Sequence, residues 1–456
     1  MPRISFPQLP KPWGLPLGLA LLVGGLTYLG YFLDRSDFAY LLASFGLAFL
    51  GYAILLGRLK AAYLLPVGLV LRLLLLPSTP TLSDDYFRFI WDGLLSASGI
   101  NPFAQLPEAF MDSTHSVQGI DQELFEKLNS SEYFTVYPPL SQFWFWLAAL
   151  WGKGVVWKHL LVMRLGILLA ELGTLIALKK LLRHYGLPLA YLAWYALNPL
   201  VIIELTGNLH FEAFMIAGIL WAGYGLVQKN WLKTAIFLSF GVLAKLLPLM
   251  LLPSLLPVLG WKKSLYAYLL VGALVVLGFL PFLDATLIES LSSSLSLYFQ
   301  RFEFNASIYY IIRWIGYQLE GYNIIQWAGP ALSVAVLLGI LAISLLPPYH
   351  AQGSLKKWMW IYVLYLLGAT IVHPWYCLVL LPLSLFTPYR FPFIWSFSIV
   401  FSYTTYRTEA YNELLWLTAL SYALALGYAV WERFFRPKRQ NPLNVFKPTS
   451  SRIGSI

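Results

Sequence analysis

Apolar segments of about twenty residues recur along almost the whole chain, and this pattern limits the possible folds more than any other feature. A membrane-spanning helix needs about 20 mostly apolar residues, and backbone inside a bilayer must satisfy its own hydrogen bonds. The apolar segments lie near residues 15–33, 38–57, 61–77, 159–178, 187–205, 208–227, 231–247, 249–260, 264–283, 324–346, 356–372, 374–387, 391–405 and 411–432. Because several are short, the sequence predicts an all-α polytopic membrane protein with twelve to fourteen transmembrane helices.

The composition supports one membrane body rather than a string of soluble domains. Of the 456 residues, 59% are hydrophobic and 11% are charged, whereas soluble domains carry about 25% charged residues. Cys377 is the single cysteine, which excludes an intrachain disulfide. The segment 15–33 lacks a signal-peptide cleavage site and is interpreted as the first span. We expect one transmembrane domain at 1–435 and a basic cytoplasmic tail at 436–456, where positive charge suits anionic lipid rather than nucleic acid.

Lysine and arginine in short loops predict the orientation, because such residues concentrate on the cytoplasmic side. The basic positions can all face the cytoplasm if the apolar segment 138–152, which follows the rigid Tyr137-Pro138-Pro139, does not cross fully. We therefore predict that 138–152 is re-entrant or interfacial. The basic positions are Arg3, Lys11, Arg58, Lys60, Lys179, Lys180, Arg183, Lys229, Lys233, Lys262, Lys263, Lys356, Lys357, Arg390, Arg433, Arg436, Lys438 and Arg439.

The same orientation places residues 78–137 outside as a large first loop. This loop contains two basic residues, Arg88 and Lys127, against nine acidic ones. The acids are Asp84, Asp85, Asp92, Glu108, Asp112, Asp121, Glu123, Glu126 and Glu132. Scarce Lys and Arg support an extracytoplasmic location.

A helix is predicted at the start of this loop, where residues 83–93 read SDDYFRFIWDG. Ser83 is a plausible N-cap, and the two acids fall in the first turn. Asp85, Arg88 and Asp92 share one polar face opposite an apolar one, which favours a helix lying on the membrane surface. The acids could also serve only the helix dipole, or pair with Arg88 at i,i+3 and i,i+4 spacing.

Other ionisable and polar residues are predicted to gather at the outer ends of helices, where they are functional candidates. A structural role is the alternative for each: hydrogen-bonded histidines, a snorkelling lysine, or ion-paired glutamates. The residues are Glu204, Asn208, His210, Glu212, Lys245, His373 and Arg407, with Arg301 in a second outer loop at about 284–322.

The ordered motifs resemble the GT-C superfamily of bacterial membrane glycosyltransferases, in particular the polyprenyl-phosphate-mannose-dependent mannosyltransferases. The resemblance covers roughly residues 80–390. Its motifs are SDDYFRFIWDG at 83–93, GINPF at 99–103, YPPL at 137–140, the stretch from Asn198-Pro199 to Glu212, KLLP at 245–248 and HPWY at 373–376.

This resemblance implies an inverting hexosyltransferase of the plasma membrane, with its site on the extracytoplasmic side. It implies a polyprenyl-phosphate sugar donor, with mannose as the expected sugar, and a lipid or glycan acceptor. Asp84 and Asp85 are the candidate general bases. Asp84 is favoured because it lies off the stripe of Arg88 and should be free of a tight salt bridge. The predicted substrate-binding residues are Arg88, Tyr137, Glu204, Asn208, His210, Glu212, Lys245, Arg301, His373 and Arg407.

Two questions stay open at this level. No cofactor is established, but a divalent metal could bind Asp84 or Asp85 together with His210 or Glu212. The main alternative function is a transporter or flippase of a lipid-linked or polar substrate. Such proteins favour internal repeats and binding at the bilayer midplane, and neither pattern is visible here.

Overall fold

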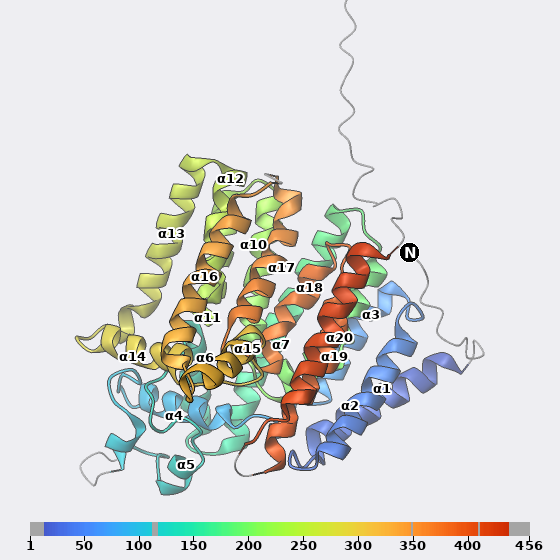
Figure 1. Ribbon diagram of the computed structural model, residues 1–456. Coiled ribbons are helices and arrows are strands. Elements are labelled where there is room, and N and C mark those ends of the chain that lie inside the picture. The colour runs from blue at the N-terminus through green and yellow to red at the C-terminus, as the bar shows by residue number, and fades with distance from the viewer. Residues whose placement is uncertain (1–12, 112–116, 348–349, 409–410, 437–456) are drawn as a thin grey trace, which may run out of the picture.

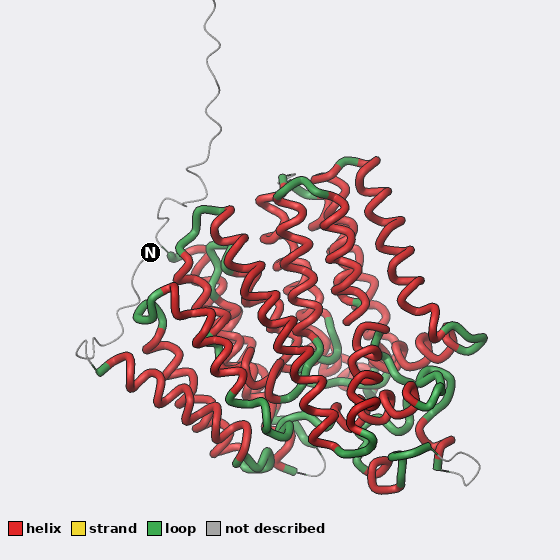
Figure 2. The backbone as a smooth tube through the Cα atoms, turned by 180° about the vertical axis from the view of Figure 1, so that it is seen from behind, coloured by secondary structure: helices red, strands yellow, loops and turns green. Residues whose placement is uncertain are grey.

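The computed structural model describes residues 13–111, 117–347, 350–408 and 411–436. Within these ranges the chain is helical and forms no strand, apart from an isolated bridge between Phe304 and Ile371. Helices run side by side between two ends that carry the loops (Figure 2). The predicted all-α class is confirmed, whereas most of the predicted tail at 436–456 lies outside the described residues.

The first part of the chain supplies three helices, the large loop and two further helices. Gly-rich faces allow close packing of the first two: a Cβ at Gly51 would lie 2.5 Å from the backbone nitrogen of Leu22. The elements are α1 (Gly14–Tyr31), α2 (Phe38–Leu55), α3 (Ala61–Leu73), α4 (Asp85–Ala97), η1 (Pro107–Phe110), α5 (Gln122–Glu126), α6 (Pro139–Gly152) and α7 (Val156–His184).

Prolines divide the middle of the chain into short pieces, because proline lacks the amide hydrogen that a helix interior needs. The segment η3 is a π-helix, a form that is rare and frequent at functional sites. The elements are η2 (Leu189–Leu192), α8 (Ala193–Ala196), α9 (Pro199–Val201), η3 (Ile202–Gly207), α10 (Glu212–Val227), α11 (Trp231–Ala244), η4 (Leu247–Leu255), α12 (Leu256–Leu259), α13 (Trp261–Phe279) and η5 (Leu280–Phe282).

The last part adds long helices and two more segments with 3₁₀ turns. Its elements are α14 (Leu287–Gln300), α15 (Ile308–Glu320), α16 (Ile325–Leu345), α17 (Ala351–Gly368), η6 (Pro374–Val379), α18 (Leu380–Ser384), α19 (Phe391–Ser398), η7 (Ile399–Arg407) and α20 (Leu415–Phe434). Helices α14 and α15 lie at the same end of the bundle as α4 and α5 (Figure 1). The first and second predicted outer loops thus share one end.

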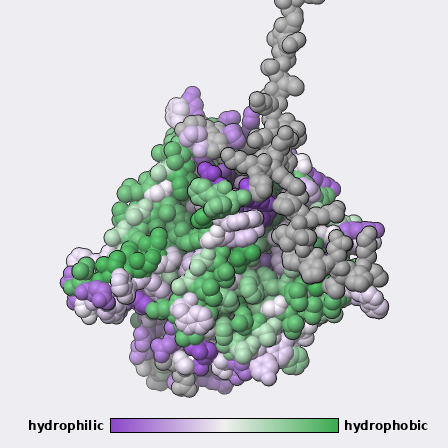
Figure 3. Space-filling view, turned by 45° about the vertical axis from the view of Figure 1, so that its right-hand side comes forward, coloured by the Kyte–Doolittle hydropathy of each residue, from purple (hydrophilic) through white to green (hydrophobic). Residues whose placement is uncertain are grey.

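On the face shown in Figure 3, hydrophobic side chains cover much of the middle of the molecule, and hydrophilic side chains gather mostly towards its two ends. Among the described residues, five helices are long and apolar enough to cross a membrane: α1, α2, α7, α13 with η5, and α16. The pair Leu189–Ala196 and Pro199–Gly207, bent by 54°, is either a sixth, broken span or a re-entrant loop. The polytopic membrane class is confirmed, but fewer helices than the predicted twelve to fourteen are both long and apolar enough to cross. Most of the other apolar segments form shorter or broken helices, whereas α17 and α20 are long enough but less apolar.

The segment 138–152 forms the single 14-residue helix α6. At 1.5 Å per residue it is about 21 Å long, short of the roughly 30 Å hydrocarbon core. It packs against α4 on one side and α7 on the other. Its predicted re-entrant or interfacial position stays a prediction.

Close contact between α4 and α6 fixes the loop helix on the bundle. A Cβ on Gly93 would lie 2.3 Å from the carbonyl oxygen of Phe145, so this position requires glycine.

The prediction that ionisable residues gather at outer helix ends is incomplete, because it did not include four residues of α3 and α7 that are fully buried: Arg72, His159, Arg164 and Glu171. Arg72 pairs with Glu171 at 2.5 Å, and Arg164 donates to four backbone carbonyls.

Candidate functional site

The two adjacent acids of the large loop begin helix α4. Asp84 occupies the N-cap position and Asp85 is the first helical residue. Ser83, which was expected to be the cap, accepts the N–H of Asp85 at its Oγ, 3.3 Å away. The predicted helix is confirmed with its start one residue later, so both carboxylates lie at the positive end of the helix dipole.

Asp84 is held by an arginine from a distant part of the chain. Its Oδ2 accepts a hydrogen bond from Nη2 of Arg35 at 2.6 Å, and each of the two side chains is about one-third exposed. The Arg35 guanidinium lies 4.9 Å from the centre of the Tyr406 ring. The expectation that Asp84 is free of a salt bridge is therefore wrong, because the turn between α1 and α2 brings Arg35 to it.

Asp85 has neutral partners instead. The Tyr137 hydroxyl donates to its Oδ2 at 3.3 Å, and Nδ2 of Asn129 donates to its Oδ1 at 2.8 Å. The Tyr137 ring packs edge-on against Phe89. Tyr137, predicted to bind substrate, thus positions one of the candidate bases.

Arg88 is buried and pairs with Asp92, not with Asp85. Its Nε donates to Asp92 at 2.8 Å, and its Nη1 donates to the carbonyls of Ser130 and Tyr133. Arg88 is 2% exposed and Asp92 is not exposed. The predicted polar face at the membrane surface is therefore wrong for Arg88 and Asp92, because residues 130–135 bond to both and both are buried. The alternative that an acid pairs with Arg88 at i,i+4 spacing is confirmed. This placement gives Arg88 a structural role in fastening the loop to α4.

Glu204 lies fully buried in the π-helix η3. Tyr403 from η7 donates its hydroxyl to Glu204. Nδ1 of His210 lies 3.2 Å from the Glu204 carboxylate and 2.9 Å from its carbonyl oxygen. The structure confirms that these two predicted site residues lie together, and it leaves Nε2 of His210 buried without a hydrogen-bond partner.

Asn208 connects this segment to the residues just before α4. Its Oδ1 accepts the N–H groups of Thr81 and Leu82, each at 3.2 Å. Tyr406 donates its hydroxyl to the Leu82 carbonyl at 3.1 Å. The position of the acid pair is thus set by η3 and η7, which are far away in the sequence.

The rings of two histidines stack on the Trp375 ring. The His210 ring lies 3.7 Å from it with a 16° interplanar angle, and the His373 ring lies 4.4 Å away at 2°. Burial, followed by the nearby charges of Lys245 and His210, lowers the pKa of His373 to about 3. His373 is therefore neutral near pH 7 and can offer a substrate an N–H but no charge.

Lys245 ends α11 and forms an ion pair with Glu212, the first residue of α10. Its Nζ lies 4.0 Å from the centre of the Tyr376 ring. Glu212 is nearly buried, whereas the Lys245 side chain is 28% exposed. Lys245 can therefore meet an anionic ligand while Glu212 holds it in place.

Two predicted residues lie at the margin. Arg301 is exposed at the end of α14. Arg407 is exposed at the end of η7, where its Nε donates to the Thr404 carbonyl at 3.0 Å. Their substrate-binding roles stay predictions.

The described residues include no group of three or more His, Cys, Asp and Glu side chains that could hold a metal ion. Of the metal ligands suggested by the sequence, His210 contacts Glu204 through Nδ1, and Glu212 pairs with Lys245.

Sequence reasoning missed Arg35, Tyr403 and Tyr406. Arg35 carried a usable signal, because the predicted orientation places it in a short outer loop where Lys and Arg are unusual. The two tyrosines carried none, since tyrosine is common at membrane interfaces.

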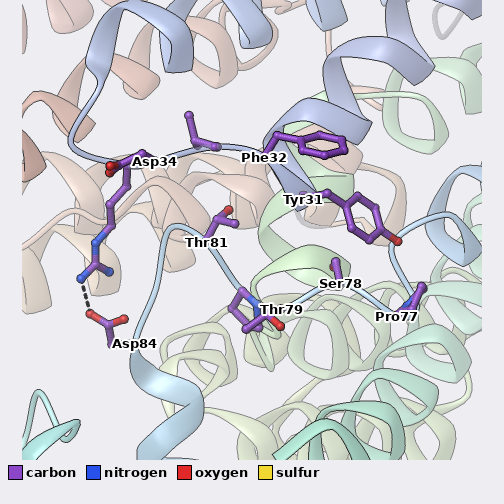
Figure 4. A pocket seen from close by; sticks show the side chains of 12 residues that line it. Tyr31, Phe32, Asp34, Pro77, Ser78, Thr79, Thr81 and Asp84 are labelled. Carbon is purple, nitrogen blue, oxygen red and sulfur yellow. Dashed lines mark hydrogen bonds and ion pairs between the residues drawn. The ribbon is translucent and has the colours of Figure 1, made fainter.

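An open pocket of about 660 Å³ adjoins Asp84 (Figure 4). It lies between the end of α1 with the following turn and the segment 77–84. The lining residues are Gly30, Tyr31, Phe32, Leu33, Asp34, Arg35, Pro77, Ser78, Thr79, Pro80, Thr81 and Asp84.

Residues 27–261, just over half of the chain, match the family model described as "Alpha-(1->6)-mannopyranosyltransferase, N-terminal domain". The matched region contains Arg35, the acid pair and Lys245, and it ends before His373. No curated protein and no solved structure gives a significant match.

Proposed function

Since the chain belongs to the alpha-(1→6)-mannopyranosyltransferase family, and is thus a membrane mannosyltransferase, we propose that it uses a polyprenyl-phosphate mannose donor. The mannosyl unit passes with inversion to an acceptor hydroxyl at the extracytoplasmic face of the plasma membrane. Family membership favours this reaction over the alternative of a transporter or flippase. The Lys and Arg distribution supports the extracytoplasmic site.

One observation carries the catalytic assignment: the Asp84 carboxylate lines an open pocket. A general base must first lie within reach of the hydroxyl whose proton it takes, and its basicity comes second. The ion pair with Arg35 is partly exposed, and such pairs contribute only about 0–1 kcal/mol, so it does not hold Asp84 away from an acceptor. Asp84 is therefore the proposed base, and Asp85 remains the alternative.

In the proposed step the acceptor oxygen attacks the anomeric carbon as the carbon–oxygen bond to the phosphate breaks. The proton of the acceptor hydroxyl passes to Asp84, and the bonding electron pair leaves with the polyprenyl phosphate. A single displacement of this kind inverts the anomeric centre and needs no carboxylate nucleophile. An α-linked product therefore requires a β-linked donor.

The growing charge on the leaving phosphate needs cations or N–H donors. Lys245 and the ring N–H of His373 are the proposed donors. Lys245 is partly exposed and adds the positive charge, and the neutral His373 adds a hydrogen bond. Nδ1 of His210 already faces the oxygens of Glu204, so His210 is not assigned to the phosphate.

The test is an assay of purified protein in detergent with β-linked polyprenyl-phosphate mannose, its α-linked isomer and a nucleotide-linked mannose. We expect transfer and release of polyprenyl phosphate from the β-linked lipid alone, and an α-linked product by NMR. Turnover of the nucleotide sugar, or of the α-linked lipid, would contradict the proposed donor and the inverting mechanism respectively.

A further inference from the structure

The pocket beside Asp84 has two chemically different ends (Figure 4). Asp34, Arg35 and Asp84 form a charged end, and Tyr31 and Phe32 form an aromatic end. Phe32 is 69% exposed although it is a large apolar side chain. An aromatic face next to fixed polar groups is typical of sites that orient a small polar ligand.

The charge of the pocket disfavours a phosphate. Arg35 is the basic lining residue, and Asp84 already pairs with it. Hydrogen bonds from the hydroxyl and the N–H of Ser36 lower the pKa of Asp34, which keeps this second carboxyl ionised. One cation against two carboxylates leaves a net negative pocket, which suits an uncharged ligand better than an anion.

We propose that this pocket is the acceptor subsite and takes a neutral saccharide of at least two sugar units. This assignment rests on the proposed function and names the acceptor class for the same site. The reacting hydroxyl lies at Asp84, and the following sugar packs on Tyr31 and Phe32. A volume of about 660 Å³ is within the usual range for ligand sites and leaves room beyond a single sugar. Arg35 is a positioning residue that holds Asp84 at the pocket's charged end.

Acceptor length tests the proposal. The probes are methyl α-mannoside and the methyl glycoside of an α-(1→6)-linked dimannoside, each with β-linked polyprenyl-phosphate mannose. In the unaltered protein we expect a higher kcat/KM for the dimannoside. Phe32→Ala should lower that kcat/KM about tenfold, the typical weight of one aromatic contact, mainly through KM. In the same variant, the kcat/KM for transfer to methyl α-mannoside should fall much less.

Tyr40→Ala is the matched control, since Tyr40 is a 59% exposed aromatic residue of the next helix that does not line the pocket. It should leave the preference for the dimannoside unchanged. Tyr31→Ala removes the second aromatic ring of the pocket, together with the hydrogen bond from the Tyr31 hydroxyl to the Leu74 carbonyl. Tyr31→Phe removes that hydrogen bond alone and keeps the ring, so it shows whether a misfolded Tyr31→Ala protein results from the lost hydrogen bond.

Three outcomes would overturn the acceptor assignment: no preference for the dimannoside in the unaltered protein, an unchanged preference in folded Phe32→Ala and Tyr31→Ala, or a rise in donor KM alone. The last outcome would give the pocket to the donor. An unaltered protein that uses no polyprenyl-phosphate mannose with either acceptor refutes the proposed function itself.

Discussion

Replacement of Asp84 by asparagine separates catalysis from structure, because the amide keeps the size of the side chain and removes its basicity. Loss of a positioned base typically costs ~10²–10⁴ in rate, which corresponds to about 3–5 kcal/mol of barrier at 1.36 kcal/mol per decade. The structural roles of this carboxylate are smaller. A charge at a helix N-terminus contributes about 0.3–1 kcal/mol, and a partly exposed ion pair with Arg35 about 0–1 kcal/mol.

The chain offers a matched control in the same loop. Asp121 is the N-cap of α5, and its carboxylate accepts the N–H of Leu124 at 2.8 Å. Asp121→Asn therefore removes a helix-terminal charge without touching the pocket. We expect Asp84→Asn to be folded and to lose mannosyl transfer by at least a hundredfold, and Asp121→Asn to stay within about twofold of the unaltered protein.

Asp85→Asn completes the comparison. This change weakens the hydrogen bonds that Asp85 accepts from Tyr137 and Asn129. We therefore expect a smaller loss of mannosyl transfer than for Asp84→Asn. The assay is initial-rate transfer from β-linked polyprenyl-phosphate mannose, with folded yield measured by size-exclusion chromatography. A folded Asp84→Asn protein with near-normal turnover refutes the preference for Asp84. If Asp85→Asn is equally active, neither acid is the base.

Three further predictions concern the donor, the orientation and the loop. Lys245→Ala and His373→Ala should raise donor KM more than acceptor KM, because both side chains lie on the proposed phosphate side; unchanged donor KM in both would remove them from the site. A cysteine at the exposed position Gln122 should react with an impermeant thiol reagent in intact cells, and labelling only after lysis would place the loop in the cytoplasm. Arg88→Ala should destabilise the protein by about 3–5 kcal/mol, because it leaves Asp92 buried without its cation, and an unchanged melting temperature would contradict this role.

Much of the architecture could be predicted from local patterns. Hydropathy indicates an all-α membrane protein because each span must be apolar over its own length, whatever it packs against. The helix at Asp85–Ala97 and its two initial acids follow from the same local rules. The number of helices of spanning length could not be predicted, since hydropathy does not register where prolines and 3₁₀ or π turns shorten an apolar segment.

The candidate site, too, could be predicted in part from the sequence, and the rest was decided by the tertiary structure. Ordered motifs predicted that Glu204, His210 and Lys245 belong to one region, and the structure places each beside another predicted residue. The pair of Arg88 with Asp92 is the i,i+4 alternative that helical spacing had left open, whereas the pair of Asp84 with Arg35, 49 residues away, was decided only by tertiary packing. Helical spacing identifies possible partners within one helix. It cannot show which partner from elsewhere in the chain the fold brings next to a charged side chain that is shielded from water. For this reason the sequence by itself determined which residues could form the site, and the tertiary structure decided which acid faces the pocket.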